Sequence, residues 1–239
     1  MGPPRGYQPL PTTHARRAPA LARGVLRCYD KPMTIKAVFF DFGGVLLQHM
    51  DGIDHPALEA KLGLPERTVF DCLYRESRYR DFQVGACTNE EWVDSIRTAA
   101  AKRMSAGMVE TFMQAWQDAE RPLNPDMMAL VDRLRGGGYL TGIISNTIPG
   151  MEQRLQAELP NFIELFDIRI GSGDLGIAKP DPGIFLHALD QAGVDAEASV
   201  FTDDVNSYAQ AARDVGMHGF HFTGYEQFAS DLRSIGVNH

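Results

Sequence analysis

Residues 35–44 read IKAVFFDFGG, and this stretch decides the fold class. The apolar run from Ile35 to Phe40 ends at Asp41, and a turn that contains Gly43 and Gly44 follows it. Apolar runs of this length are typical of parallel strands that are buried on both faces. We therefore expect a buried strand over 35–40 that presents Asp41 at its carboxyl end.

Strands and helices are expected to alternate from residue 122 to the C-terminus. Four further apolar runs predict strands at 139–145, 166–171, 199–202 and 218–222. The segments between them have helical patterns, and one of these helices has a recognisable start because Asn124 can cap it and Pro125 fits its first position. This alternation predicts an α/β fold, a doubly wound, Rossmann-like parallel sheet with helices on both faces.

Residues 54–119 separate the first strand from the rest of the predicted sheet, and they show helical patterns without a convincing strand. Apolar residues recur there at helical spacing, at Leu58, Leu62, Val69, Leu73, Trp92, Ile96, Met108, Phe112 and Trp116. The pattern predicts an all-helical cap subdomain inserted after the first strand. We place the cap at 49–121 and the Rossmann-like core at 33–48 and 122–239.

Residues 1–32 differ in composition from the rest of the chain. They are rich in proline and arginine, and no acidic residue precedes Asp30. Such a segment cannot bury a core, so we expect a disordered N-terminal extension. It resembles an organelle transit peptide superficially, but an extension upstream of a domain that begins near Met33 is the favoured interpretation because no clear amphipathic helix is present.

Composition excludes several classes of partner. The 239-residue chain has a formal net charge of −8 and no basic face rich in aromatics, so nucleic acid is not an expected partner. Since no apolar run approaches the roughly 20 residues that cross a bilayer, no membrane partner is expected either. Three scattered cysteines fit a reducing, cytoplasmic location. The sequence leaves open whether the protein is a monomer or a homodimer.

Chemically active side chains follow the ends of the predicted strands. Because ligands of open parallel sheets bind beyond the carboxyl ends of the strands, these residues are expected to share one edge. They are Asp41, the pair Ser145–Asn146, Lys179 and the pair Asp203–Asp204. The three aspartates are hard oxygen ligands of the kind that Mg²⁺ prefers, and without a cation they would repel one another.

The other groups at this edge suit a phosphate. Lys179 adds a positive charge, Ser145 offers a donor, and the backbone amides of Gly43 and Gly44 can approach a phosphate because no side chains intervene. Positioning and charge neutralisation dominate phosphoryl transfer. The set therefore indicates a phosphoryl-transfer site in which a carboxylate nucleophile forms an aspartyl-phosphate that water releases.

Four segments together resemble the motifs of the haloacid dehalogenase-like hydrolases. They are FFDFGGVLL (39–47), IISNT (143–147), AKPDPGIF (178–185) and VFTDD (200–204). The segment FQVGACTNEEW (82–92) resembles the cap entry of the subgroup with a small helical cap, and the chain is most similar to the branch that includes bacterial sugar-phosphate phosphatases. The resemblance implies a Mg²⁺-dependent phosphatase with this fold.

The resemblance also implies a role for each motif residue. Asp41 is the nucleophile, and it binds Mg²⁺ together with the Gly43 carbonyl and Asp204. Asp203 then holds a metal-bound water or the lysine.

On the substrate side, the resemblance implies that Ser145 binds the phosphoryl group and that Lys179 neutralises it. Asn146 and Gly44 are expected to bind substrate beside them.

Position 43 departs from the family pattern. Phosphatases of this superfamily usually carry a second Asp there, as general acid for the leaving group, whereas this chain has Gly43. General acid catalysis contributes roughly 10²–10⁴ in rate. Either the enzyme is slow, or its substrates leave readily, or another group such as His49 or His55 donates the proton. The similar sugar-phosphatase branch also carries glycine at this position.

The leading hypothesis is a Mg²⁺-dependent phosphatase of a small phosphorylated substrate, with a sugar phosphate as one candidate. A 2-haloacid dehalogenase that uses the same aspartate is the alternative enzyme, although Asp203 and Asp204 argue against it because that chemistry needs no metal. A phosphonatase would need a cap lysine, for which Lys61 is the early-cap candidate. A non-catalytic module that binds a phosphorylated metabolite is the third hypothesis.

Overall fold

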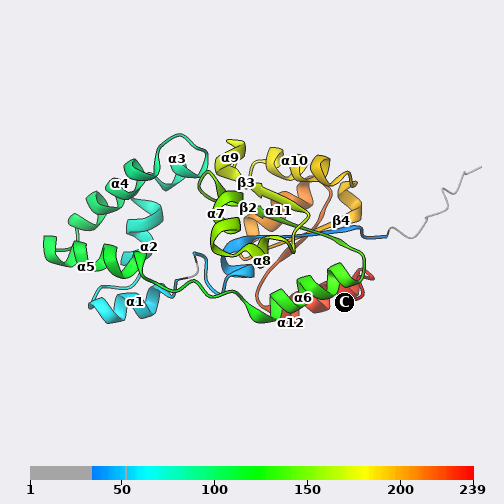
Figure 1. The fold of residues 1–239 in the computed structure, drawn as a ribbon, viewed down its shortest axis with the longest axis horizontal. Helices are drawn as coiled ribbons and strands as arrows, with labels where there is room; N and C mark the ends of the chain where they lie inside the picture. Colours follow the sequence, from blue (N-terminus) through cyan, green and yellow to red (C-terminus); the bar gives the residue numbers. More distant parts are fainter. Residues whose placement is uncertain (1–33, 52) are drawn as a thin grey trace, which may run out of the picture. The chain divides into compact units, whose positions relative to one another are not determined.

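Five parallel strands form the sheet of the computed structural model, which describes residues 34–51 and 53–239 (Figure 1). The predicted extension over 1–32 lies outside the described residues. The strands are β1 (Ala37–Phe40), β2 (Leu140–Ser145), β3 (Ile168–Gly171), β4 (Ser199–Asp203) and β5 (His218–His221). Their order in the sheet is β3-β2-β1-β4-β5, so the earliest strand lies at the centre. The predicted doubly wound α/β fold is confirmed.

Helices cover both faces of this sheet (Figure 1). On one face, Val38 and Phe40 of β1 pack in a buried cluster with α6 (Pro125–Gly136), α7 (Met151–Glu158), α8 (Pro160–Ile163) and α12 (Tyr225–Ser234). On the other face, Ala37 and Phe39 pack with α10 (Pro182–Ala192) and α11 (Asn206–Asp214). Side chains of a strand alternate between its two faces, so all four residues of β1 are buried.

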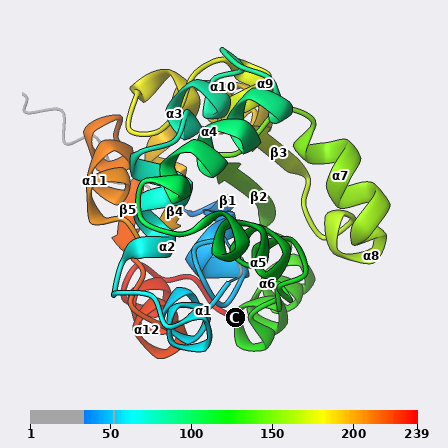
Figure 2. The same cartoon turned by 90° about the vertical axis from the view of Figure 1, so that its left-hand side faces the viewer.

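The segment between β1 and β2 is helical, as expected from its pattern (Figure 2). It contains α1 (His55–Leu62), α2 (Thr68–Phe70), a π-helical turn (Asp71–Arg75), α3 (Tyr79–Gln83), α4 (Asn89–Ala101) and α5 (Ala106–Gln117). Trp92, Ile96 and Phe112 belong to an apolar cluster of this segment, separate from the two clusters of the sheet. The insertion therefore has a core of its own. In the described part of the chain, no helix is long and apolar enough to cross a membrane.

Two adjacent stretches of chain connect this insertion to the sheet. Leu47 and Leu123 form an antiparallel bridge. The amide of Gln48 donates to the Pro122 carbonyl at 3.0 Å, and the amide of Asn124 donates to the Leu46 carbonyl at 2.8 Å. These contacts join the two stretches that flank the helical insertion, and the cap boundaries at 49 and 121 stay predictions.

The predicted start of α6 is confirmed, while the starts of two strands are shifted. Asn124 caps α6 by accepting a hydrogen bond from the amide of Met127, with Pro125 at the first helical position. Strands β1 and β3 both begin two residues later than predicted. The apolar pattern extends beyond the paired residues, because burial continues where the ladder of hydrogen bonds has ended.

One cap in the helical insertion was not anticipated. The Thr88 hydroxyl accepts a hydrogen bond from the amide of Glu91 at 3.2 Å, and the Glu91 carboxylate accepts one from the amide of Thr88 at 2.9 Å. This capping box begins α4, which carries Trp92 and Ile96 into the cap core.

We expect Thr88→Ala to lower the free energy of unfolding by about 1 kcal/mol, because an N-cap is replaced by a residue that cannot accept the hydrogen bond. Denaturant unfolding measures the change. The matched control is Thr98→Ala on the same helix, whose hydroxyl donates back to the carbonyl of Asp94 and is exposed. Equal losses in the two variants would contradict the assignment of Thr88 as the cap.

Candidate active site

Asp41 lies at the carboxyl end of the central strand, at the point where the order of the strands reverses. β1 pairs with β2 on one side and with β4 on the other, and the amide of Asp41 donates to the Thr202 carbonyl at 2.9 Å. The register places Asp203 beside Asp41. Strands β2 and β3 lie on one side of β1, and β4 and β5 lie on the other. The strand order therefore reverses at β1, and open parallel sheets bind ligands at such a switch point.

Three carboxylates gather at this point. Asp41, Asp203 and Asp204 each offer one oxygen, and these three oxygens lie within 4.8 Å of one another. Burial and the adjacent charge of Asp41 raise the pKa of Asp203 to about 7 and that of Asp204 to about 6, against the opposing effect of Lys179. The cluster is therefore costly to keep ionised without more positive charge.

Lys179 supplies the positive charge that the structure places among these acids. Its ammonium Nζ is 2.9 Å from Asp41 Oδ1 and 2.5 Å from Asp203 Oδ2, and the residue is 3% exposed. Burial alone would lower the pKa of Lys179, but the two carboxylates raise it above its ordinary value. Lys179 thus stays charged and orients the Asp41 carboxylate.

Asn146 holds Lys179 in place. Its side-chain amide donates to the Lys179 carbonyl at 2.9 Å, and its side-chain oxygen accepts from the Lys179 amide at 2.7 Å. Both ends of the amide are used in this way, so Asn146 positions the lysine, and its expected contact with substrate stays a prediction. A Ser-Asn pair at the end of a strand does not by itself predict a contact with the backbone of Lys179.

The glycines after Asp41 are required by close approaches to neighbouring atoms. Gly44 has φ of +71°, and a Cβ on it would lie 2.4 Å from Asp204 Oδ2. Its amide, which we expected to be available to a phosphate, donates to the His49 carbonyl at 2.8 Å. Gly44 therefore leaves room for the Asp204 carboxylate, and its expected contact with substrate stays a prediction.

Gly43 has even less room for a side chain. A Cβ at this position would lie 1.7 Å from the backbone oxygen of Met50, so the loop after β1 excludes any larger residue in its present conformation. The departure from the family pattern at position 43 is thus built into the backbone of the loop 43–50.

The donor set fits a divalent cation. When all four groups are ionised, three carboxylates face one ammonium, so two negative charges remain at the site. Mg²⁺ prefers oxygen ligands and is usually bound by one or two carboxylates. Asp203 already accepts hydrogen bonds from Lys179 at 2.5 Å and from the Val205 amide at 2.8 Å. Asp41 and Asp204 are accordingly the better candidates for direct ligands.

Ser145 and Gly43 line a cavity of about 500 Å³ that continues toward the cap. Ser145 ends β2 and is buried, as expected for a group held at the strand end. Tyr74, Tyr79 and Trp116 of the cap line the same cavity. From the sequence, Trp116 is expected in the cap core, and Tyr74 and Tyr79 belong to the charged cap segment 74–81, a candidate contact for an anionic or sugar substrate.

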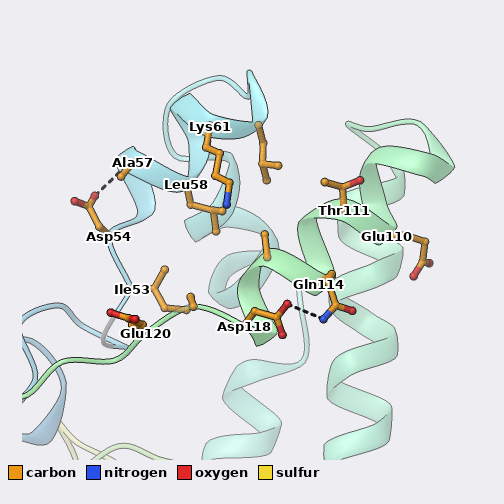
Figure 3. A pocket seen from close by; sticks show the side chains of 13 residues that line it. Ile53, Asp54, Ala57, Leu58, Lys61, Glu110, Thr111, Gln114, Asp118 and Glu120 are labelled. Carbon is orange, nitrogen blue, oxygen red and sulfur yellow. Dashed lines mark hydrogen bonds between the residues drawn. The ribbon is translucent and has the colours of Figure 1, made fainter.

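A second, larger hollow of about 800 Å³ lies within the cap between α1 and α5 (Figure 3). Lys61 lines this groove, together with Glu110 and Asp118. Lys61 therefore faces a different hollow from the one beside Ser145, and the phosphonatase hypothesis loses the lysine on which it depended.

Of the two histidines considered as proton donors, His55 has its ring bound to Asp51, whereas His49 contributes a backbone contact. The His55 ring lies 3.1 Å from both oxygens of the Asp51 carboxylate and stacks on Tyr74. The His49 carbonyl closes the glycine loop. The two histidines on β5 also bond to backbone: His221 contacts the Asp204 carbonyl at 3.0 Å, and His218 contacts that of Glu197 at 3.1 Å.

Comparison with known proteins agrees with the motifs. A family model described as haloacid dehalogenase-like hydrolase matches residues 35–216. Bifunctional epoxide hydrolase 2 of Rattus norvegicus is 28% identical over 77% of this chain, but the chain spans only 36% of that protein. Sesquiterpene phosphatase AstK of Aspergillus oryzae is 26% identical over 84% of this chain and 97% of its own length.

A dehalogenase and a solved structure are also similar. (S)-2-haloacid dehalogenase 4A of Burkholderia cepacia is 30% identical over 60% of this chain and 58% of its own length. The crystal structure of a magnesium complex of a HAD family enzyme from Bacteroides thetaiotaomicron has a TM-score of 0.61 at 22% identity. It covers 83% of this chain and 98% of that chain, which shows a shared fold.

Mg²⁺ is expected to stabilise the protein, and more so at higher pH. At a Mg²⁺ concentration of 100 times the Kd, the free energy of unfolding should rise by about 2.7 kcal/mol. Mg²⁺ binds ionised carboxylates, and the pKa values of Asp204 and Asp203 are about 6 and about 7. The stabilisation should therefore be small near about pH 5 and complete at about pH 8.

The metal-free protein should show the opposite trend. Between the unfolded pKa of an aspartate, about 3.9, and the folded values, the folded state holds protons that the unfolded state has released. Stability in EDTA therefore falls as pH rises through this window. Thermal unfolding with Mg²⁺ or EDTA measures both trends, and Asp204→Asn should remove most of the Mg²⁺ effect. An equal Mg²⁺ effect at both pH values would contradict the assignment.

Gly43→Asp should lower activity rather than restore a general acid. If the loop had room, the new carboxyl group would raise the rate by roughly 10²–10⁴. Since a Cβ here meets the Met50 backbone, we expect instead at least a tenfold loss in kcat/KM and a lower Tm. Gly107→Asp, in the cap helix α5 where a Cβ meets nothing within 4 Å, is the control. A faster Gly43→Asp enzyme would refute the steric argument.

Proposed function

The chain belongs to the haloacid dehalogenase-like hydrolase family, and we propose that it is a magnesium-dependent phosphohydrolase of a small phosphorylated metabolite. One observation carries the proposal: buried Lys179 bridges two of three clustered carboxylates at the switch point of the sheet. The phosphatase AstK, which matches over nearly its whole length, supports the same activity. A sugar phosphate, a cytoplasmic location and a monomeric or dimeric state stay predictions from the sequence.

Asp41 acts as the nucleophile in this proposal. Lys179 holds its Oδ1 atom, so that a carboxylate oxygen can attack phosphorus while the bond from phosphorus to the ester oxygen breaks. The resulting aspartyl-phosphate is hydrolysed by water, which releases phosphate and restores Asp41. The division into two displacements replaces one difficult step by two easier ones.

Neutralisation of the phosphoryl oxygens is assigned to the remaining residues. Lys179 and the Ser145 hydroxyl lie at the same sheet edge as Asp41 and supply a charge and a donor. Mg²⁺ held by Asp41, Asp204 and the Gly43 carbonyl would add positive charge against the same oxygens. Asp203 keeps Lys179 in position through their 2.5 Å contact.

The leaving oxygen must be protonated without an acidic side chain at position 43, which is a glycine. Substrates whose leaving groups are weakly basic therefore depend less on an acid, and they are expected to react fastest. Activity as an epoxide hydrolase is not proposed, because the chain spans only 36% of the rat protein of that name.

Asp41→Asn should reduce phosphate release from p-nitrophenyl phosphate by at least about 10³-fold, because the nucleophile is lost. EDTA should have a comparable effect on the unaltered protein. Phosphate release with and without Mg²⁺ measures both, and Asp214→Asn at the end of α11 is the matched acidic control.

Two outcomes would favour the other hypotheses. Halide release from a 2-haloacid that persists in EDTA would establish a dehalogenase, which the similarity to haloacid dehalogenase 4A makes the second candidate. Phosphate binding without turnover of any ester or haloacid would establish a non-catalytic module.

A further inference from the structure

The cavity beside the phosphate site is lined mainly by apolar and aromatic side chains. It has a volume of about 500 Å³, within the roughly 300–1,000 Å³ typical of small-molecule sites. Gly43 and Ser145 line its inner end, so the cavity is continuous with the candidate phosphate site. Whatever group is esterified to the phosphate would extend into this space.

The cap contributes a chain of aromatic rings to the cavity. Tyr74 and Tyr79 meet edge to face with centroids 4.7 Å apart, Tyr79 and Trp92 lie 5.5 Å apart, and Trp92 and Trp116 lie 5.5 Å apart. All four line the cavity. The contacts fix the rings against one another and present a continuous apolar wall.

The sheet side contributes aliphatic residues from one helix. Met151 and Leu155 lie four residues apart on α7 and share one face, and Leu159, just beyond the end of the helix, also lines the cavity. Ile148, just before the helix, lines the cavity beside them, and Met50 from the loop after β1 does so with 38% of its surface exposed. An exposed methionine over a site is typical of an adaptable binding surface.

Many buried polar groups around the cavity already have partners within the protein, whereas the lining residues Asn89 and Glu158 are exposed. The Trp92 indole donates to the Leu73 carbonyl at 3.4 Å and to Ser77 Oγ at 3.3 Å, and the Tyr74 hydroxyl donates to Asp51. These bonds leave the rings, rather than their polar atoms, as the contribution to the cavity.

The two lining arginines use part of their five N–H donors on backbone carbonyls. Arg121 donates to the carbonyls of Trp116 at 3.2 Å and Ala119 at 3.0 Å. Arg154 donates to the carbonyls of Pro149 and Ile148. A sugar site instead needs several donors and acceptors aimed at the hydroxyl groups, because an unpaired buried polar group is costly.

We propose that the phosphate ester hydrolysed here carries an extended apolar or aromatic group, which lies against Tyr79, Trp116 and the α7 face, rather than a sugar. This inference rests on the proposed phosphatase function. It assigns Trp116 and Leu159 to substrate specificity.

Phenyl phosphate, 4-hexylphenyl phosphate and glucose 1-phosphate test the proposal with the full-length protein and Mg²⁺. The two aryl esters have closely similar leaving groups and differ only in apolar length. We expect kcat/KM for the hexylphenyl ester to be at least ten times that for phenyl phosphate. It should exceed kcat/KM for glucose 1-phosphate by a still larger factor. Trp116→Ala should reduce the ratio of the two aryl esters at least fivefold. Leu186→Ala, at a 53% exposed position of α10, should leave the ratio unchanged.

Binding provides a second measurement that does not depend on turnover. Both tryptophans of the chain, Trp92 and Trp116, line the cavity, so intrinsic fluorescence reports its occupancy. Octylphosphonate should bind at least tenfold more tightly than methylphosphonate.

The outcomes separate this inference from the proposed function. Turnover of phenyl phosphate without any gain from the hexyl group, or a preference for glucose 1-phosphate, would overturn the apolar substrate and leave the phosphatase intact. If no ester is hydrolysed, the phosphatase proposal fails, and the phosphonates decide: tighter binding of octylphosphonate supports the apolar cavity, and equal binding overturns it.

Discussion

The buried ammonium of Lys179 is the group on which the arrangement of the site depends. It bridges Asp41 and Asp203, and its own backbone is held at two points by Asn146. Burial would discharge an isolated lysine, and proximity would push the carboxylates apart, but each charge offsets the cost of the others. Removing Lys179 would leave three clustered carboxylates without a neighbouring cation. The cluster therefore depends on Lys179 more than on any one of its acids.

The sheet topology explains how residues from distant parts of the chain meet in this cluster. Because β1 lies between β2 and β4, both neighbours deliver their ends beside Asp41. The glycine loop then determines how closely the acids approach, since Gly44 leaves room for Asp204 and Gly43 packs on Met50. The same packing removes the position where a general acid would stand. In the proposed function, the charged groups at the sheet edge hold the phosphate and the apolar surface of the cap selects its ester.

The fold and the site could largely be predicted from the sequence because both depend on local patterns at strand ends. The apolar run before Asp41 indicates a buried central strand, and paired acids at 203–204 indicate a cation site. What the sequence could not provide were contacts set by tertiary packing. Three examples are the hydrogen bonds of Asn146 to Lys179, the hydrogen bond of the Gly44 amide to His49, and the aromatic wall of the cap. In each, the spacing of the residues in the sequence does not indicate that they meet.

The most direct test of the central claim is a crystal structure of the protein with Mg²⁺ and beryllofluoride, which mimics a phosphoryl group on aspartate. We predict beryllofluoride on Asp41, contacted by Lys179 and Ser145, with Mg²⁺ bound by Asp41 and Asp204. Beryllofluoride absent from Asp41, or Mg²⁺ bound away from this sheet edge, would contradict it.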